Sequence, residues 1–224
     1  MTKTQGSKIG SMDNFLSSED RRRIRETVQA MERATAGEIV PCVAPASYHY
    51  PVGAIIGAAS LALPTALLGA HFLGGFFWLG QDNLWLFLGL LSIVFWPWYL
   101  VVRRVPVLHR LFISEHEMAE EVREAAFVNF YKNGLHFTRD HTGVLIFISA
   151  FERQVIILAD KGINDKVPRD RWDAIVKNLT MGIRAKQSAA AICRAVETVG
   201  RLLAEHFPPR SDDVDELQNL VVDP

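Results

Sequence analysis

Charged side chains are almost absent between Ile39 and Val102, where Asp82 is the only Asp, Glu, Lys or Arg. This lack excludes ordinary surface helices from the stretch, because a helix at a protein surface carries polar residues on its outer face. Two apolar runs, at about 52–73 and 84–102, flank a short polar turn. Each is about twenty residues long, enough for an α-helix to cross a hydrocarbon core of ~30 Å. The pattern predicts a transmembrane hairpin, the alternative being two buried helices of a large soluble core.

Cysteine is scarce as well. Cys42 and Cys193 are the only two cysteines, and neither belongs to a CxxC or Cys/His cluster, which excludes a disulfide framework and a zinc site of that kind. The net charge of −1 gives no electrostatic reason to expect nucleic acid as a partner. The sequence also lacks the GxGxxG, Walker A, HExxH and GxSxG motifs, so it offers no standard catalytic signature.

Aromatic residues are present where the two apolar runs begin and end. Such side chains, with an apolar body and a polar tip, form belts at membrane interfaces. The two predicted rims consist of Tyr48, His49, Tyr50, Trp96, Trp98 and Tyr99 on one side, and of Phe76, Phe77, Trp78 and Trp85 on the other. The aromatic pattern therefore supports the transmembrane hairpin.

Lysine and arginine are absent from the turn of the hairpin but occur on both flanks. Arg103, Arg104 and Arg110 follow the second run, and the arginine run 21–23 precedes the first. By the positive-inside rule, we expect both termini and the soluble domain on the cytoplasmic side and the turn outside. The first fifty residues lack a short apolar segment followed by a small-residue cleavage site, so we expect no signal peptide.

The segment before the hairpin predicts one helix and one strand. Ser17 with Asp20 approximates a capping box at the start of a helix that would run to about Thr35. Residues 38–44 are typical of a short strand, in which Pro41 favours an edge or bulged position. We interpret the helix's arginines as a solvated face, with contact to phospholipid head groups as the alternative.

The segment after the hairpin predicts three helices and two strands. A helix at 114–134 begins with a second capping-box pattern, and further helices are expected at about 172–183 and 192–203. Residues 143–150 and 154–159 are short apolar runs rich in branched side chains, which predicts a buried antiparallel strand pair. Together these elements predict an α/β layer structure in which helices cover a small mixed sheet.

The order of the elements predicts one soluble domain interrupted by the membrane hairpin. Residues 16–50 are too few to form a core alone, so we expect them to fold with residues 103–207. The transmembrane hairpin occupies residues 51–102. Residues 1–15 are polar and predict a flexible arm, and residues 208–224 predict a loose acidic tail.

Polar residues gather at the ends of the predicted strands. Asp140 and His141 lead into the strand at 143–150, and Asp160 follows the strand at 154–159. In an antiparallel pair the start of one strand lies beside the end of the next, so Asp140 and Asp160 should be neighbours. Two carboxylates there can hold a hard cation such as calcium or position a water, with Glu38 as a candidate third ligand. Alternatively, the two aspartates start a turn and cap a loop, and Glu38 pairs with an arginine.

Three stretches that include these residues resemble the TPM domain family, which is named for a thylakoid lumen protein, a photosystem II accessory protein and a modulator of a nematode receptor. The stretches are Thr-Ala-Gly-Glu-Ile-Val at 35–40, Arg-Asp-His-Thr-Gly followed by an apolar strand at 139–148, and Glu-Arg-Gln followed by an apolar strand and Ala-Asp-Lys-Gly-Ile at 152–163. The likeness covers most of the predicted soluble domain.

The resemblance implies a Rossmann-like α/β/α sandwich. Some family members bind calcium and have weak acid phosphatase activity, whereas others are accessory proteins of membrane complexes. Asp140 falls on the Asp of the family's DNG motif, but His141 replaces the Asn. Asn164 stands where an acidic residue is usual, which argues against a metal site and phosphatase activity here.

The chain looks most similar to a bacterial branch in which a membrane hairpin interrupts the domain, and whose members resemble proteins found together with LemA-like membrane proteins. We therefore expect a bacterial inner-membrane protein with two spans, acting as a non-catalytic accessory or interaction protein whose partners are the lipid bilayer and a LemA-like protein. The alternative hypothesis is a weak calcium-dependent phosphatase using Asp140, Asp160 and Glu38.

Overall fold

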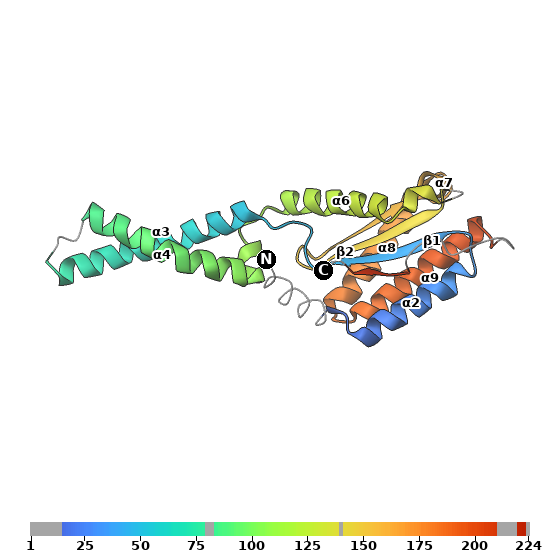
Figure 1. Cartoon of the computed structure of the whole chain (residues 1–224), viewed down its shortest axis with the longest axis horizontal. Coiled ribbons are helices and arrows are strands. Elements are labelled where there is room, and N and C mark those ends of the chain that lie inside the picture. Colours follow the sequence, from blue (N-terminus) through green and yellow to red (C-terminus); the bar gives the residue numbers. More distant parts are fainter. Residues whose placement is uncertain (1–14, 79–82, 139–140, 210–218, 223–224) are drawn as a thin grey trace. The chain divides into compact units, whose positions relative to one another are not determined.

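The computed structural model describes residues 15–78, 83–138, 141–209 and 219–222. The chain divides into two compact units (Figure 1). The sandwich unit comprises the residues up to Ser47 and those from Ala119 onward, and the hairpin unit comprises Tyr48–Met118. The hairpin unit is thus an insertion in the sequence of the sandwich unit.

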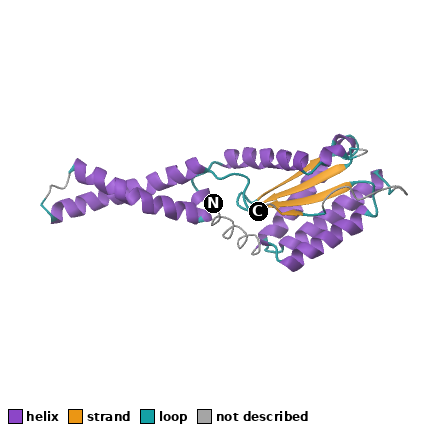
Figure 2. Cartoon of the chain, in the orientation of Figure 1, coloured by secondary structure: helices purple, strands orange, loops and turns teal. Residues whose placement is uncertain are grey.

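A mixed four-stranded sheet forms the centre of the sandwich unit (Figure 2). Its strands are β1 (Glu38–Ala44), β2 (Gly143–Ser149), β3 (Gln154–Ala159) and β4 (Val221–Val222), in the order β3-β2-β1-β4. β1 is parallel to β2 and to β4, whereas β2 and β3 are antiparallel. The predicted strand pair and the small mixed sheet are confirmed.

Helices cover both faces of this sheet. α2 (Ser18–Glu32), α8 (Arg169–Arg184) and α9 (Ser188–His206) pack on one face, and α6 (Glu115–Lys132) packs on the other (Figure 1). The alternation of side chains along β1 and β2 explains the two layers. Ile39, Val43, Val144, Ile146 and Ile148 belong to the core under α2, α8 and α9, while Val40, Cys42, Ala44, Leu145 and Phe147 belong to the core under α6. The predicted α/β/α sandwich is confirmed.

Local sequence signals set the helix boundaries. The Ser17 side chain accepts a hydrogen bond from the Asp20 N–H at 3.1 Å, and the Asp20 carboxylate accepts one from the Ser17 N–H at 3.0 Å, which completes the predicted capping box. Ser114 Oγ accepts a hydrogen bond from the Glu117 N–H at the start of α6. Gly134 ends that helix region with a φ of 75°, a conformation that glycine adopts without strain.

The hairpin unit contains two long apolar helices, α3 (Pro51–Phe76) and α4 (Leu84–Arg104), followed by the short α5 (Pro106–Arg110). Both long helices are long and apolar enough to cross a membrane. The buried residues of α3 are all small, namely Gly53, Ala54, Gly57, Ala58, Ala62, Ala66, Ala70 and Gly74.

Large apolar side chains of the same two helices point outward. Phe72 is 71% exposed, and Ile93 is 69% exposed. A helix of a water-soluble protein has the opposite arrangement, with large side chains inside. Small buried residues allow close packing between membrane helices, and the indole N–H of Trp98 on α4 also donates to Thr65 Oγ on α3 at 3.2 Å.

Four details depart from the sequence predictions or cannot be compared with them. Pro41 is not in an edge strand, because β1 lies between β2 and β4. Proline has no backbone N–H to donate, but β4 pairs only with Cys42 and Val43, so the pairing of β1 with β4 does not need an N–H at residue 41. Phe15 packs against the sandwich core rather than belonging to a flexible arm. Val221 and Val222, which were predicted to belong to the loose acidic tail, form β4. The rest of the arm, most of the tail and the turn at Asp82 lie outside the described residues.

Candidate functional site

The predicted site lies at the sheet end where β1 and β2 begin and β3 ends. Glu38 is paired in register with Gly143, and the Asp160 N–H donates to the Gly143 carbonyl at 2.9 Å. Glu38 and Asp160 are therefore brought to the same end of the sheet, as predicted. They occupy the outer two of three adjacent strands, which places their backbones about 10 Å apart for a strand spacing of about 4.8 Å.

Asp160 has the contacts of a helix cap. It precedes the short helix α7 (Lys161–Asn164), and its Oδ1 accepts a hydrogen bond from the Lys161 N–H at 2.7 Å. Its Oδ2 lies 3.1 Å from His141 Nδ1, a contact that becomes an ion pair when the imidazole is protonated. His141 adopts a φ of 54°, which turns the chain into β2. The loop-capping alternative describes these contacts of Asp160. His141, which precedes β2, lies in contact with Asp160.

Glu38 begins β1 and is buried, with 8% of its surface exposed. Its N–H donates to the Thr142 carbonyl at 3.1 Å, and Thr142 Oγ donates to the Ala36 carbonyl at 3.0 Å. These bonds join the segment that leads into β1 to the segment that leads into β2. The Glu38 backbone is therefore held beside the start of β2.

Gly143, at the start of the middle strand β2, lies between Glu38 on β1 and Asp160 after β3. A Cβ atom at this glycine would lie 2.5 Å from the carbonyl oxygen of Leu135, in the short helix η1 (Leu135–Phe137). The backbone of η1 therefore fills the space above Gly143. For Glu38 and Asp160 to share one cation, their side chains would have to reach around this backbone.

The predicted third carboxylate, Asp140, lies outside the described residues. Within the described part of the chain, no group of three or more His, Cys, Asp or Glu side chains is placed to hold a metal ion. The proposed ligand set Asp140, Asp160 and Glu38 therefore stays a prediction. The structure places two of its members, Asp160 and Glu38, at one end of the sheet.

Comparison with known families identifies the domain. Residues 104–202 match the family model of the TPM domain. The chain contains a TPM domain. The match runs from the end of α4 to within α9, so it includes both strands of the antiparallel pair and the segment around Asp160.

A solved structure resembles nearly the whole chain. It is the NMR structure of the BA42 protein from the psychrophilic bacterium Bizionia argentinensis, and the alignment covers 93% of this chain and 96% of that protein, with 20% sequence identity and a TM-score of 0.57. At this identity the likeness supports the fold of the TPM domain and no more. No curated protein matches the chain.

Sequence reasoning missed a buried carboxylate at the opposite end of the TPM domain's sheet. Glu152, in the turn between β2 and β3, is 0% exposed. Its Oε1 accepts a hydrogen bond from the Ser47 N–H at 2.9 Å, and its Oε2 accepts one from Ser149 Oγ. Ser47 Oγ also donates to Ser149 Oγ at 3.0 Å. The available sequence signal was a serine at or shortly after the end of each of two strands, and a glutamate in a turn is normally solvated.

This second polar group lies where the chain leaves the sheet for the hairpin unit. The backbone N–H groups of Ala150 and Phe151 donate to the carbonyls of Ala44 and Pro45, both at 3.0 Å. The turn between β2 and β3 therefore holds the segment that follows β1. Ser47 is the last residue of the sandwich unit before the hairpin unit begins.

Proposed function

We propose that the protein is an integral inner-membrane accessory protein, whose TPM domain lies on the cytoplasmic side and binds a membrane-protein partner. The large apolar side chains that α3 and α4 direct outward support the membrane location. The arginines on both flanks of the hairpin support the orientation.

A patch of exposed apolar side chains on the sandwich unit is the observation that carries the binding role. Among the described residues of this unit, five large hydrophobic side chains are exposed, and four of them lie on α6 and η1. We call these four the aromatic patch: Phe127 (48% exposed), Val128 (56%), Tyr131 (60%) and Phe137 (80%). The fifth is Met181, on α8.

Ring contacts hold part of the aromatic patch together. The rings of Tyr131 and His136 are 4.8 Å apart, and those of His136 and Phe137 are 3.8 Å apart. Exposed aromatic side chains of this kind are enriched at protein interfaces and supply much of their binding energy. Glu120, Glu121, Arg123 and Glu124 lie earlier on α6, so the apolar surface is confined to the last turns of the helix. The patch fits a partner with an apolar contact surface, and we propose a LemA-like membrane protein.

Site-specific photocrosslinking in native membranes tests this role. A photoreactive amino acid replaces Tyr131 in the full chain, and the matched control carries it at Glu124, which is also exposed on α6. We expect an adduct with a LemA-like protein, identified by mass spectrometry, from position 131 and none from position 124. Tyr131→Glu should also abolish co-purification of that protein. Equal adducts at the two positions, or only adducts with a second copy of this chain, would contradict the proposal.

Metal-assisted phosphate-ester hydrolysis is the second candidate function. The observation that favours it is the placement of Asp160, in contact with His141, at the same sheet end as Glu38. In this hypothesis Asp140, Asp160 and Glu38 hold calcium, which would polarise the phosphate oxygens. Asp160→Asn and Glu38→Gln should then weaken calcium binding, measured by calorimetry, and slow the hydrolysis of a generic phosphomonoester. Hydrolysis that is unchanged in both variants would exclude this site.

A further inference from the structure

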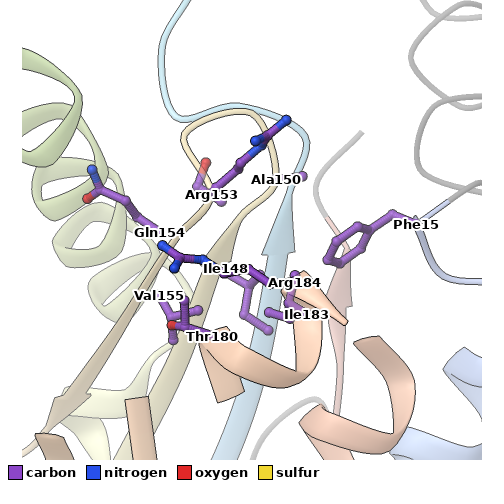
Figure 3. Close-up of a pocket in the computed structure, with 10 residues that line it drawn as sticks. Phe15, Ile148, Ala150, Arg153, Gln154, Val155, Thr180, Ile183 and Arg184 are labelled. Carbon is purple, nitrogen blue, oxygen red and sulfur yellow. The ribbon is translucent and has the colours of Figure 1, made fainter. Parts of the chain in front are cut away.

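A pocket of about 390 Å³ lies between the β2–β3 turn and the C-terminal end of α8 (Figure 3). It belongs entirely to the sandwich unit, at the sheet end opposite Glu38 and Asp160. Its apolar lining consists of Phe15, Ile148, Ala150, Val155 and Ile183, and its polar lining of Ser149, Arg153, Gln154, Thr180 and Arg184. The volume suits a small polar group with a short apolar neighbour, because small-molecule sites begin at about 300 Å³.

The charged groups of this pocket have one sign. Arg153 comes from the turn and Arg184 from the end of α8 (Figure 3), and neither Asp nor Glu is among the described lining residues. In the described part of the chain, no carboxylate forms an ion pair with either guanidinium. Two arginines beside an apolar wall fit an anion that carries a hydrocarbon group, and the planar guanidinium matches phosphate oxygens.

Glu152 fixes the turn that carries Arg153. Its carboxylate is buried and accepts hydrogen bonds from Ser47 and Ser149, so the residue before Arg153 cannot move freely. Arg153 itself has a φ of 56°, in the left-handed region. The position of its backbone is therefore set before any ligand arrives, which reduces the entropy lost on binding.

The chain leads from this end of the sheet into the first apolar helix. Ser47 is held by Glu152, and Pro51 starts α3 four residues later. Four residues span at most about 14 Å when fully extended. If α3 crosses the bilayer, as the proposed function has it, the pocket's end of the sheet is tethered close to the lipid head groups.

We propose that this pocket binds the phosphate group of an anionic phospholipid. Arg153 and Arg184 donate hydrogen bonds to the phosphate oxygens, and the glycerol part of the lipid contacts Val155 and Ile183. The proposal concerns a site distinct from the aromatic patch. This lipid site rests on the proposed membrane location in one respect only, namely that a lipid is the source of the phosphate group.

Native mass spectrometry of the full-length protein in detergent tests the site. The probe is phosphatidylglycerol, compared with phosphatidylcholine, and the test variant is Arg153→Gln/Arg184→Gln. The matched control is Arg169→Gln/Arg171→Gln, which removes the same charge from exposed residues at the other end of α8. A basic residue near a lipid surface contributes about fivefold to binding. We therefore expect the test variant to bind phosphatidylglycerol ~25-fold more weakly than the wild type, and the control to differ by less than about twofold.

A second variant checks the result without removing an arginine. Thr180→Glu adds a carboxylate at a residue of α8 that lines the pocket together with the two arginines, so it should weaken lipid binding at least about fivefold. Equal binding by wild type and test variant, or equal weakening in test and control variants, would overturn the proposal.

Competition with soluble phosphate compounds shows whether the pocket binds a lipid phosphate or a free phosphate compound. Inorganic phosphate and glycerol phosphate should compete weakly, because they lack the apolar part of a lipid. If either binds as tightly as phosphatidylglycerol, the lipid assignment is overturned in favour of a soluble phosphate ligand. If the protein proves to lie outside membranes but Arg153 and Arg184 still select phosphatidylglycerol, the membrane location fails and the lipid site stands.

Discussion

Replacing Glu152 by alanine should be the most destabilising single change in the turn between β2 and β3. The carboxylate is fully buried and accepts hydrogen bonds from the Ser47 N–H and from Ser149 Oγ. In Glu152→Ala both donors lose their acceptor. Ser149 Oγ keeps a contact of 3.0 Å with Ser47 Oγ, so the Ser47 N–H bears most of the loss.

The size of the effect follows from these contacts. A hydrogen bond to a charged group contributes about 1.5–3 kcal/mol, and an unsatisfied donor costs about 1–3 kcal/mol. Ser47 is only half-buried, and removal of a buried carboxylate relieves its desolvation cost, so we expect a net loss of about 2–3 kcal/mol. Glu152→Gln retains one carbonyl acceptor for the Ser47 N–H and should lose only about 1 kcal/mol.

Urea unfolding of the full chain in detergent, followed by circular dichroism, measures these differences. With a slope of about 2 kcal/mol per molar urea, Glu152→Ala should lower the midpoint by about 1–1.5 M. Glu124→Ala, at an exposed position of α6, is the matched control and should leave the midpoint nearly unchanged. A midpoint for Glu152→Ala equal to that of the control would refute the reasoning about this buried carboxylate.

Two further predictions concern glycines. Gly143→Ala should destabilise the sandwich unit by about 1–3 kcal/mol, because the new Cβ would lie 2.5 Å from the Leu135 carbonyl oxygen, which is part of the backbone. Gly37→Ala should destabilise it less, because the new Cβ would lie 2.8 Å from the end of the Leu203 side chain, which can rotate. Urea midpoints that rank the two in the opposite order would contradict this. Gly57→Ala should lower the thermal midpoint in detergent, because its Cβ would lie 2.6 Å from the Phe112 ring, whereas Gly89→Ala has nothing within 4 Å and should be neutral or slightly stabilising. Equal changes in thermal midpoint for Gly57→Ala on α3 and Gly89→Ala on α4 would argue against the observed packing of α3.

Helical and strand periodicity predicted most of the fold because the core residues follow it closely. Ile24 and Val28, one helical turn apart on α2, are both 0% exposed. The alternating faces of β2 likewise separate the two cores. The strand β4 could not be predicted, because two apolar residues after a long polar segment carry no periodic signal.

The candidate sites differ in how far the sequence revealed them. The antiparallel pairing of β2 and β3 follows from their apolar runs, so the neighbourhood of His141 and Asp160 was predictable. Glu152 was not, because its burial depends on Ser47, which is 105 residues away in the sequence. The pocket between Arg153 and Arg184 is formed by three separate segments of the chain, and no local pattern records how they meet.

The central claim is that α3 and α4 cross the membrane as a hairpin and return the chain to the side from which it entered. Single cysteines at Asn83, Arg33 and Glu205, treated with a membrane-impermeant maleimide in intact cells and in inverted vesicles, test it directly. The native Cys42 and Cys193 are buried and should react little. We predict that position 83 is labelled only from outside, and that positions 33 and 205 are labelled only in inverted vesicles. Labelling of positions 33 and 205 from opposite sides of the membrane would contradict the account.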